Sequence, residues 1–140
     1  MRKFLAAALV TTAMLAPQAA SAQALAGTWA GIVTQTFPDG REVSFTAMVS
    51  FGTGGPVLIA YPSDACGGTL VPVAMKGTPT YREDITYGLD ICVDGGTVTL
   101  TPAGDTIEYH WMSPGNGEAV GTLRPTDKSL PPEHPEAAVG

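Results

Sequence analysis

Basic residues are scarce in this sequence. Seven Lys and Arg residues stand against thirteen Asp and Glu, a net charge of −6. Two of the basic residues, Arg2 and Lys3, open the chain, and without them 5 basic and 13 acidic residues give −8. Such a charge argues against nucleic acid and anionic membrane surfaces as partners. We therefore expect no nucleic-acid binding.

Motifs that would mark an enzyme are also missing. The sequence has no Gly-x-Ser-x-Gly, no His-Glu-x-x-His and no glycine-rich phosphate loop followed by a helix. Of the two histidines, His134 lies close to the C-terminus, and His110 has no sequence neighbours that form a catalytic or metal-binding pattern with it. We expect a protein that is not an enzyme, with no catalytic residues, no metal and no cofactor.

Long hydrophobic runs are absent after the first residues. Arg2 and Lys3 precede an apolar stretch at 4–15, and Ala20-Ser21-Ala22 is typical of a cleavage site. The stretch is too short for a transmembrane helix. The pattern predicts a signal peptide over 1–22 and a soluble protein in the periplasm or outside the cell, without membrane insertion.

Only two cysteines are present, Cys66 and Cys92. In an oxidising compartment an isolated pair favours a disulfide, and its spacing is wrong for a redox Cys-x-x-Cys centre. Closing a loop of this length would stabilise the fold by about 3.5 kcal/mol in the chain-entropy model.

Short strand-like runs fill the exported part of the chain. Apolar residues alternate with polar ones in 43–51, 97–101 and 106–112, the period-2 pattern of half-buried strands. Turn signals of Gly, Pro, Asp and Asn separate the runs. The pattern predicts eight strands, at 27–36, 42–52, 55–61, 68–75, 79–87, 96–102, 106–112 and 118–124.

The short connections between these runs favour antiparallel neighbours. We expect an all-β fold, an eight-stranded antiparallel up-and-down barrel with one disulfide, which is monomeric; a two-sheet sandwich is the alternative. The β-barrel domain would occupy 23–124. A proline-rich, aperiodic stretch at 125–140 predicts a disordered tail. In a meander, alternate turns gather at one end, and the turns with Cys66 and Cys92 have the same parity.

The sequence resembles a set of exported bacterial β-domains without an assigned activity, some of which follow bacterial serine/threonine kinases. The resemblance is carried by Trp29-Ala30-Gly31, Tyr61-Pro62-Ser63, Cys66-Gly67-Gly68-Thr69-Leu70, Cys92-Val93-Asp94-Gly95-Gly96-Thr97-Val98-Thr99-Leu100 and Gly121-Thr122-Leu123-Arg124. It implies a sensing or binding role. Gly27-Thr28-Trp29 with Arg124 also resembles, more distantly, the lipocalin and calycin pattern, in which a Trp closes one end of the barrel under an Arg.

Glu83 is the most unusual residue of the predicted strands. It shares a strand face with Tyr81, Ile85 and Tyr87, so an inward aromatic face carries a carboxylate into the core. A buried charge has to be paired, hydrogen-bonded or protonated. Arg124 or a tyrosine hydroxyl could be the partner. Glu83 and Arg124 are therefore candidates for an interior polar anchor, either a structural pair or a ligand contact.

Acidic residues gather in alternate turns, at the end expected to carry the disulfide. With Trp111 as an aromatic neighbour, this candidate acidic rim consists of Asp39, Asp64, Asp90, Asp94 and Glu118. Asp is also common in turns for local hydrogen bonding. The first hypothesis is an exported binding module that engages an envelope or extracellular protein, such as a basic protein or a hydrolase to be inhibited. The alternative is a carrier of a small apolar molecule inside the barrel.

Overall fold

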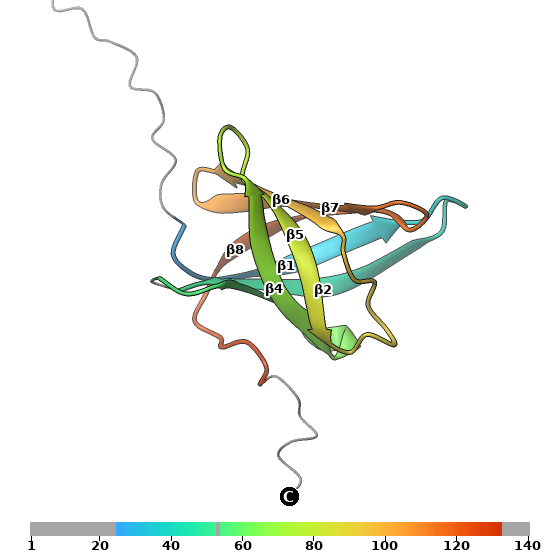
Figure 1. Ribbon diagram of the computed structural model, residues 1–140, viewed down its shortest axis with the longest axis horizontal. Helices are drawn as coiled ribbons and strands as arrows, with labels where there is room; N and C mark the ends of the chain where they lie inside the picture. Colours follow the sequence, from blue (N-terminus) through green and yellow to red (C-terminus); the bar gives the residue numbers. More distant parts are fainter. Residues whose placement is uncertain (1–24, 53, 133–140) are drawn as a thin grey trace, which may run out of the picture.

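The chain folds into one closed barrel (Figure 1). The structure, a computed structural model, describes residues 25–52 and 54–132. Within them the strands are β1 (Gly27–Thr36), β2 (Glu42–Phe51), β3 (Val57–Tyr61), β4 (Cys66–Ala74), β5 (Thr80–Tyr87), β6 (Thr97–Ala103), β7 (Thr106–Ser113) and β8 (Gly117–Thr126). A short 3-10 turn, η1 (Pro62–Asp64), joins β3 to β4. The predicted all-β class and eight-stranded antiparallel barrel are confirmed.

Each strand pairs antiparallel with the next in sequence, and β8 pairs with β1 to close the barrel. The turns after β1, β3, β5 and β7 therefore lie at one end, on the right in Figure 1, and the other turns lie at the opposite end. Cys66 and Cys92 form a disulfide at the first of these ends, with their Cα atoms 6.2 Å apart. The predicted pairing is confirmed, and we call this the disulfide end.

The core lies inside the barrel and follows the alternation of the sequence. On β7, Ile107, Tyr109 and Trp111 are buried, whereas Glu108 and Met112 are exposed. β5 repeats the pattern with Tyr81, Glu83 and Ile85 inside. Because side chains of a strand point alternately to its two faces, the apolar set of each strand faces the barrel interior. Among the described residues, Glu83 is the one buried residue that belongs to the charged amino acids.

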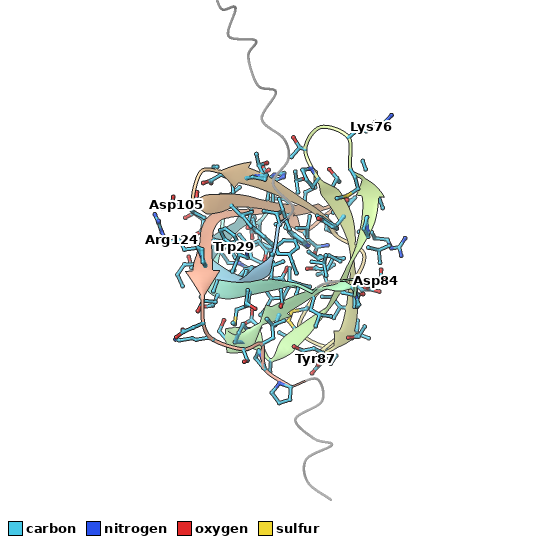
Figure 2. The ribbon with its side chains drawn as sticks, turned by 90° about the vertical axis from the view of Figure 1, so that its left-hand side faces the viewer. Trp29, Lys76, Asp84, Tyr87, Asp105 and Arg124 are labelled. Carbon is cyan, nitrogen blue, oxygen red and sulfur yellow. A yellow bond between two sulfur atoms is a disulfide. The ribbon has the colours of Figure 1, made fainter. Side chains whose placement is uncertain are left out.

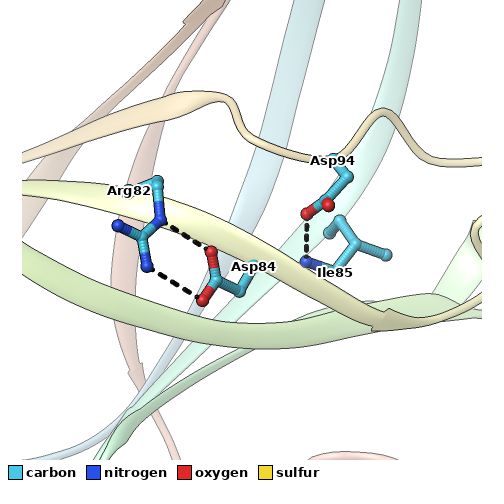
Figure 3. A network of polar contacts seen from close by, with 4 residues as sticks. All are labelled: Arg82, Asp84, Ile85 and Asp94. Carbon is cyan, nitrogen blue, oxygen red and sulfur yellow. Dashed lines mark hydrogen bonds and ion pairs between the residues drawn. The ribbon is translucent and has the colours of Figure 1, made fainter.

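β5 and β6 pair over a short stretch, which shapes the disulfide end. Their ladder covers Thr80 to Arg82 on β5, and Glu83 continues it by bonding Gly95 and Gly96. Beyond that point the chain leaves the ladder as the β5–β6 loop, residues 88–96, which carries Cys92. Asp94 of this loop accepts a hydrogen bond from the Ile85 N–H at 2.8 Å, replacing a ladder partner (Figure 3).

The ends of the chain modify the expected domain limits. β8 runs through Thr126, so Pro125 and Thr126 belong to the last strand and not to the tail predicted to begin at 125. Pro131 and Pro132 line a hollow beside Pro62 and Cys66. The expected signal peptide at 1–22 and the tail residues 133–140 lie outside the described residues. No helix in the described part of the chain is long and apolar enough to cross a membrane.

Candidate functional site

Glu83 lies inside the barrel, as its strand parity predicts. Its neighbours Arg82 and Asp84 point outward and pair with each other, with Nε of Arg82 2.9 Å from Oδ1 of Asp84 (Figure 3). Only 2% of the Glu83 surface remains exposed. A carboxylate this deeply buried requires polar partners.

Three side chains from two other strands surround the Glu83 carboxyl group. The Tyr61 hydroxyl, at the end of β3, donates a hydrogen bond to Oε2. Nε1 of Trp111, on β7, donates to Oε1 at 3.1 Å. The Tyr109 hydroxyl lies 2.6 Å from that of Tyr61. Since the Tyr61 proton is directed to Glu83, the proton of this second contact comes from Tyr109. We call Glu83, Tyr61, Tyr109 and Trp111 the polar cluster.

Burial shifts the ionisation of the polar cluster. It raises the pKa of Glu83 from 4.5 to about 7, although the hydrogen bonds from Tyr61 and Trp111 act in the opposite direction. Asp94 adds a smaller upward shift through charge repulsion. Burial also raises the pKa values of Tyr61 and Tyr109 well above 10.0, so both hydroxyls stay protonated. Glu83 is thus the member that changes charge near neutral pH.

A cavity of about 130 Å³ lies next to the polar cluster, at the disulfide end. Its lining extends from buried Glu83 to exposed Ile91, so the cavity reaches the surface. Asp64 of η1 and Cys92 contribute to the wall. The remaining lining residues are Gln35, Phe37, Phe45, Tyr61, Val93, Tyr109 and Trp111.

Arg124 does not belong to this site, and its assignment as an interior anchor was wrong. Its side chain is exposed, and Figure 2 shows it directed away from the barrel. Arg124 pairs in register with Ala30 near the end opposite the disulfide. Trp29, its expected partner in a lipocalin-like closure, packs against the core and donates to the Ala26 carbonyl. The tyrosine hydroxyl, the other expected alternative, is the partner of Glu83.

Trp111 was expected on the acidic rim, and this placement was also wrong. Only 6% of its surface is exposed, and its indole points into the barrel. Trp111 takes part in the site as a wall of the cavity and as a hydrogen-bond donor. Parity along 106–112 already placed it on the inward face, so the strand pattern was the better guide than its position near a turn.

The carboxylates of the predicted rim lie on the turns and strand ends of the disulfide end, but most have local partners. Asp39 accepts from the Arg41 N–H at 3.0 Å, and Asp94 accepts from Ile85. Oε2 of Glu118 lies 2.6 Å from Nε2 of His110 on the outer wall. Asp90 is exposed. Of the five, Asp64 alone lines the cavity. Hydrogen bonds or ion pairs within the barrel therefore explain the positions of three of these carboxylates, Asp39, Asp94 and Glu118.

The described residues include no cluster of three His, Cys, Asp or Glu side chains that could hold a metal ion. No protein-family model, curated protein or solved structure matches this chain. The cavity and its polar cluster are therefore the features from which its function has to be argued.

The aromatic residues on other strands that complete the cavity could not be identified from the sequence. Phe45 and Tyr61 meet edge to face, with ring centroids 5.4 Å apart, although β2 and β3 share a ladder only over Met48 to Ser50. Contacts of this kind depend on how the barrel curves. Alternation along one strand cannot predict them.

Proposed function

We propose that this chain is an exported binding protein whose barrel accepts a small organic molecule at the disulfide end. The observation that carries the proposal is the position of Glu83, a buried carboxyl group in the wall of a mostly apolar cavity. Ligand sites commonly combine apolar walls with a few convergent polar groups. Of the two functions expected from the sequence, carriage of a small ligand has this direct support.

The size of the cavity limits the ligand. An apolar protein cavity of about 150 Å³ holds benzene, and the cavity here measures about 130 Å³. It matches one ring or a short branched chain, with a polar group directed to the polar cluster. Typical sites for drug-sized ligands are larger, from about 300 Å³.

Binding without catalysis is the form of the proposal that the site supports. A general base or nucleophile needs a partner within hydrogen-bond reach of the reacting group. Glu83 already accepts from Tyr61 and Trp111, and His110 is paired with Glu118 on the outer wall. Export to the periplasm or beyond the cell fits the disulfide, since such bonds persist in oxidising compartments.

The proposal is tested by titrating the purified protein with benzyl alcohol while following backbone amide NMR signals. We expect saturable shifts at residues lining the cavity. Val93→Trp, which places an indole in the cavity wall, should abolish them. Val120→Trp, an equivalent change at an exposed position on the outer wall, should leave them intact. No saturable shift in the wild type, or equal loss in both variants, would exclude the cavity as a ligand site.

A second candidate, contact with an envelope protein through the same end, has one favourable observation. Leu89 and Ile91 are exposed apolar residues, 59% and 62%, on the loop that Cys92 anchors. Exposed apolar residues on a fixed loop are typical of interfaces. Ile91→Asp should abolish chemical cross-linking to a specific envelope protein, whereas Val73→Asp, at the opposite end and 57% exposed, should not. Equal cross-linking by both variants would remove this candidate.

A further inference from the structure

We propose that the ligand of the cavity is a small organic cation, an ammonium group on a single-ring or short hydrocarbon body. The inference rests on the proposed function and assigns the charge of the ligand. The observation behind it is that Glu83 is hydrogen-bonded but has no counter-ion. Neither ion pair among the described residues includes it, and its partners Tyr61 and Trp111 are neutral donors.

The charged side chains that line the cavity are all acidic. Its titratable acids are Glu83 and Asp64, and it contains no Lys, Arg or His. A buried carboxylate without a counter-ion is unfavourable, and a cation in the cavity would neutralise it. An anionic ligand would add repulsion, while a neutral one would leave the Glu83 charge uncompensated.

The walls of the cavity suit a cation as well. Phe37, Phe45, Tyr61, Tyr109 and Trp111 line it together. Aromatic ring faces attract ammonium groups, and cages of such rings are a known way to bind them. The Phe37 ring already makes such a contact, because the Arg41 guanidinium carbon lies 4.4 Å from its centroid.

Binding of such a cation should depend on the ionisation of Glu83. The groups that face its carboxyl are Tyr61 from β3 and Tyr109 and Trp111 from β7; Asp94 from the β5–β6 loop acts on it at longer range. Asp64 also lines the cavity. Both tyrosines remain neutral, so Glu83 and the two aspartates are the acidic groups near the cavity, and the Arg41 guanidinium against the Phe37 ring is a basic one.

Three probes with the same ring separate charge from shape: benzylammonium, benzyl alcohol and benzoate. At about pH 8, where Glu83 is ionised, we expect benzylammonium to bind at least about tenfold more tightly than benzyl alcohol, by calorimetry or NMR titration. Benzoate should bind most weakly. Glu83→Gln should reduce the preference for benzylammonium over benzyl alcohol to about twofold or less. Glu108→Gln, the same change on the outer face of β7, should keep the full preference.

The outcomes distinguish this inference from the proposed function. If benzylammonium and benzyl alcohol bind equally well, or if Glu108→Gln loses the preference as Glu83→Gln does, the cationic assignment is wrong and the cavity remains a ligand site. If none of the probes binds, the proposed function fails with it. Should Glu83→Gln not fold, the wild type provides the test, because the preference for benzylammonium must decline as the pH falls below about 7. A preference unchanged by pH would overturn the assignment.

Discussion

Glu83 on β5 and Trp111 on β7 meet inside the barrel, with Nε1 of the indole 3.1 Å from Oε1 of the carboxyl group, although β6 lies between their strands. Gly96, the last residue of the β5–β6 loop, leaves the space for this contact. A Cβ atom at Gly96 would lie 2.1 Å from Nε1 of Trp111. The contact between Glu83 and Trp111 therefore depends on a residue without a side chain.

Gly96→Ala should displace the Trp111 indole and break its hydrogen bond to Glu83. We expect a loss of about 1–3 kcal/mol in the free energy of unfolding, the usual effect of overpacking a core. Tryptophan fluorescence should also change, because the Trp111 indole would move. Gly52→Ala is the control, since nothing lies within 4 Å of a Cβ there. Equal stability of the two variants would show that the indole has no fixed position.

The stability of the protein should fall as Glu83 ionises. The pKa of this group is about 7 in the fold and near 4.5 in the unfolded chain, so the folded state holds the proton more tightly. Its contribution is therefore complete below about pH 4.5 and is lost as the pH rises through 7. The difference of 2.5 pKa units corresponds to about 3 kcal/mol.

Urea unfolding of the wild type and of Glu83→Gln at several pH values measures this term. The advantage of the wild type over the variant should shrink by about 3 kcal/mol between pH 4.5 and 8. The difference between the two proteins isolates Glu83 from the other carboxyl groups. A difference independent of pH would mean that Glu83 titrates like an exposed glutamate.

The barrel could be predicted from the sequence because its strands carry a local signal. Alternation along 43–51 and 106–112 places side chains inside or outside, and turn parity brings Cys66 and Cys92 to one end. Glu83 could be found in the same way, as a carboxylate on an inward face. These inferences need only one strand, or the order of the strands.

The partners of Glu83 could not be chosen by the same reasoning. The alternation of side chains shows which residues of another strand point inward. It does not show which of them lies level with Glu83 along the barrel axis. Tyr61 and Trp111 reach the carboxyl group because of the stagger between β3, β5 and β7. Arg124 was excluded by its position, since it lies on the outer face near the opposite end.

Tyr61→Phe should destabilise the protein and raise the pKa of Glu83 further. The substitution removes the donor to Oε2 of Glu83 and the acceptor for Tyr109. Leaving buried polar groups unsatisfied costs about 1–3 kcal/mol. The hydrogen bond from Tyr61 lowers the pKa of Glu83, so its loss shifts the titration upward.

Tyr81→Phe is the matched control for this change. Tyr81 is also buried and on an inward face, but its hydroxyl makes no hydrogen bond within the described residues. Its substitution should change the free energy of unfolding by less than about 0.5 kcal/mol. NMR titration of the Glu83 carboxyl carbon follows the pKa in both variants. A Glu83 pKa unchanged by Tyr61→Phe would contradict the role of that hydroxyl.

The disulfide should support both the fold and the cavity. It joins residues 26 apart in sequence, and the chain-entropy model gives about 3.5 kcal/mol for closing such a loop. Cys92 and Val93 also form part of the cavity wall, so the bond fixes that wall to the start of β4.

The double variant Cys66→Ala/Cys92→Ala should therefore lose stability to urea and also bind benzyl alcohol more weakly. Wild-type protein kept in reductant should behave like the variant, which separates loss of the bond from loss of the sulfur atoms. If stability falls while the affinity for benzyl alcohol is unchanged in both samples, the β5–β6 loop holds its position without the disulfide, and the bond serves the fold alone.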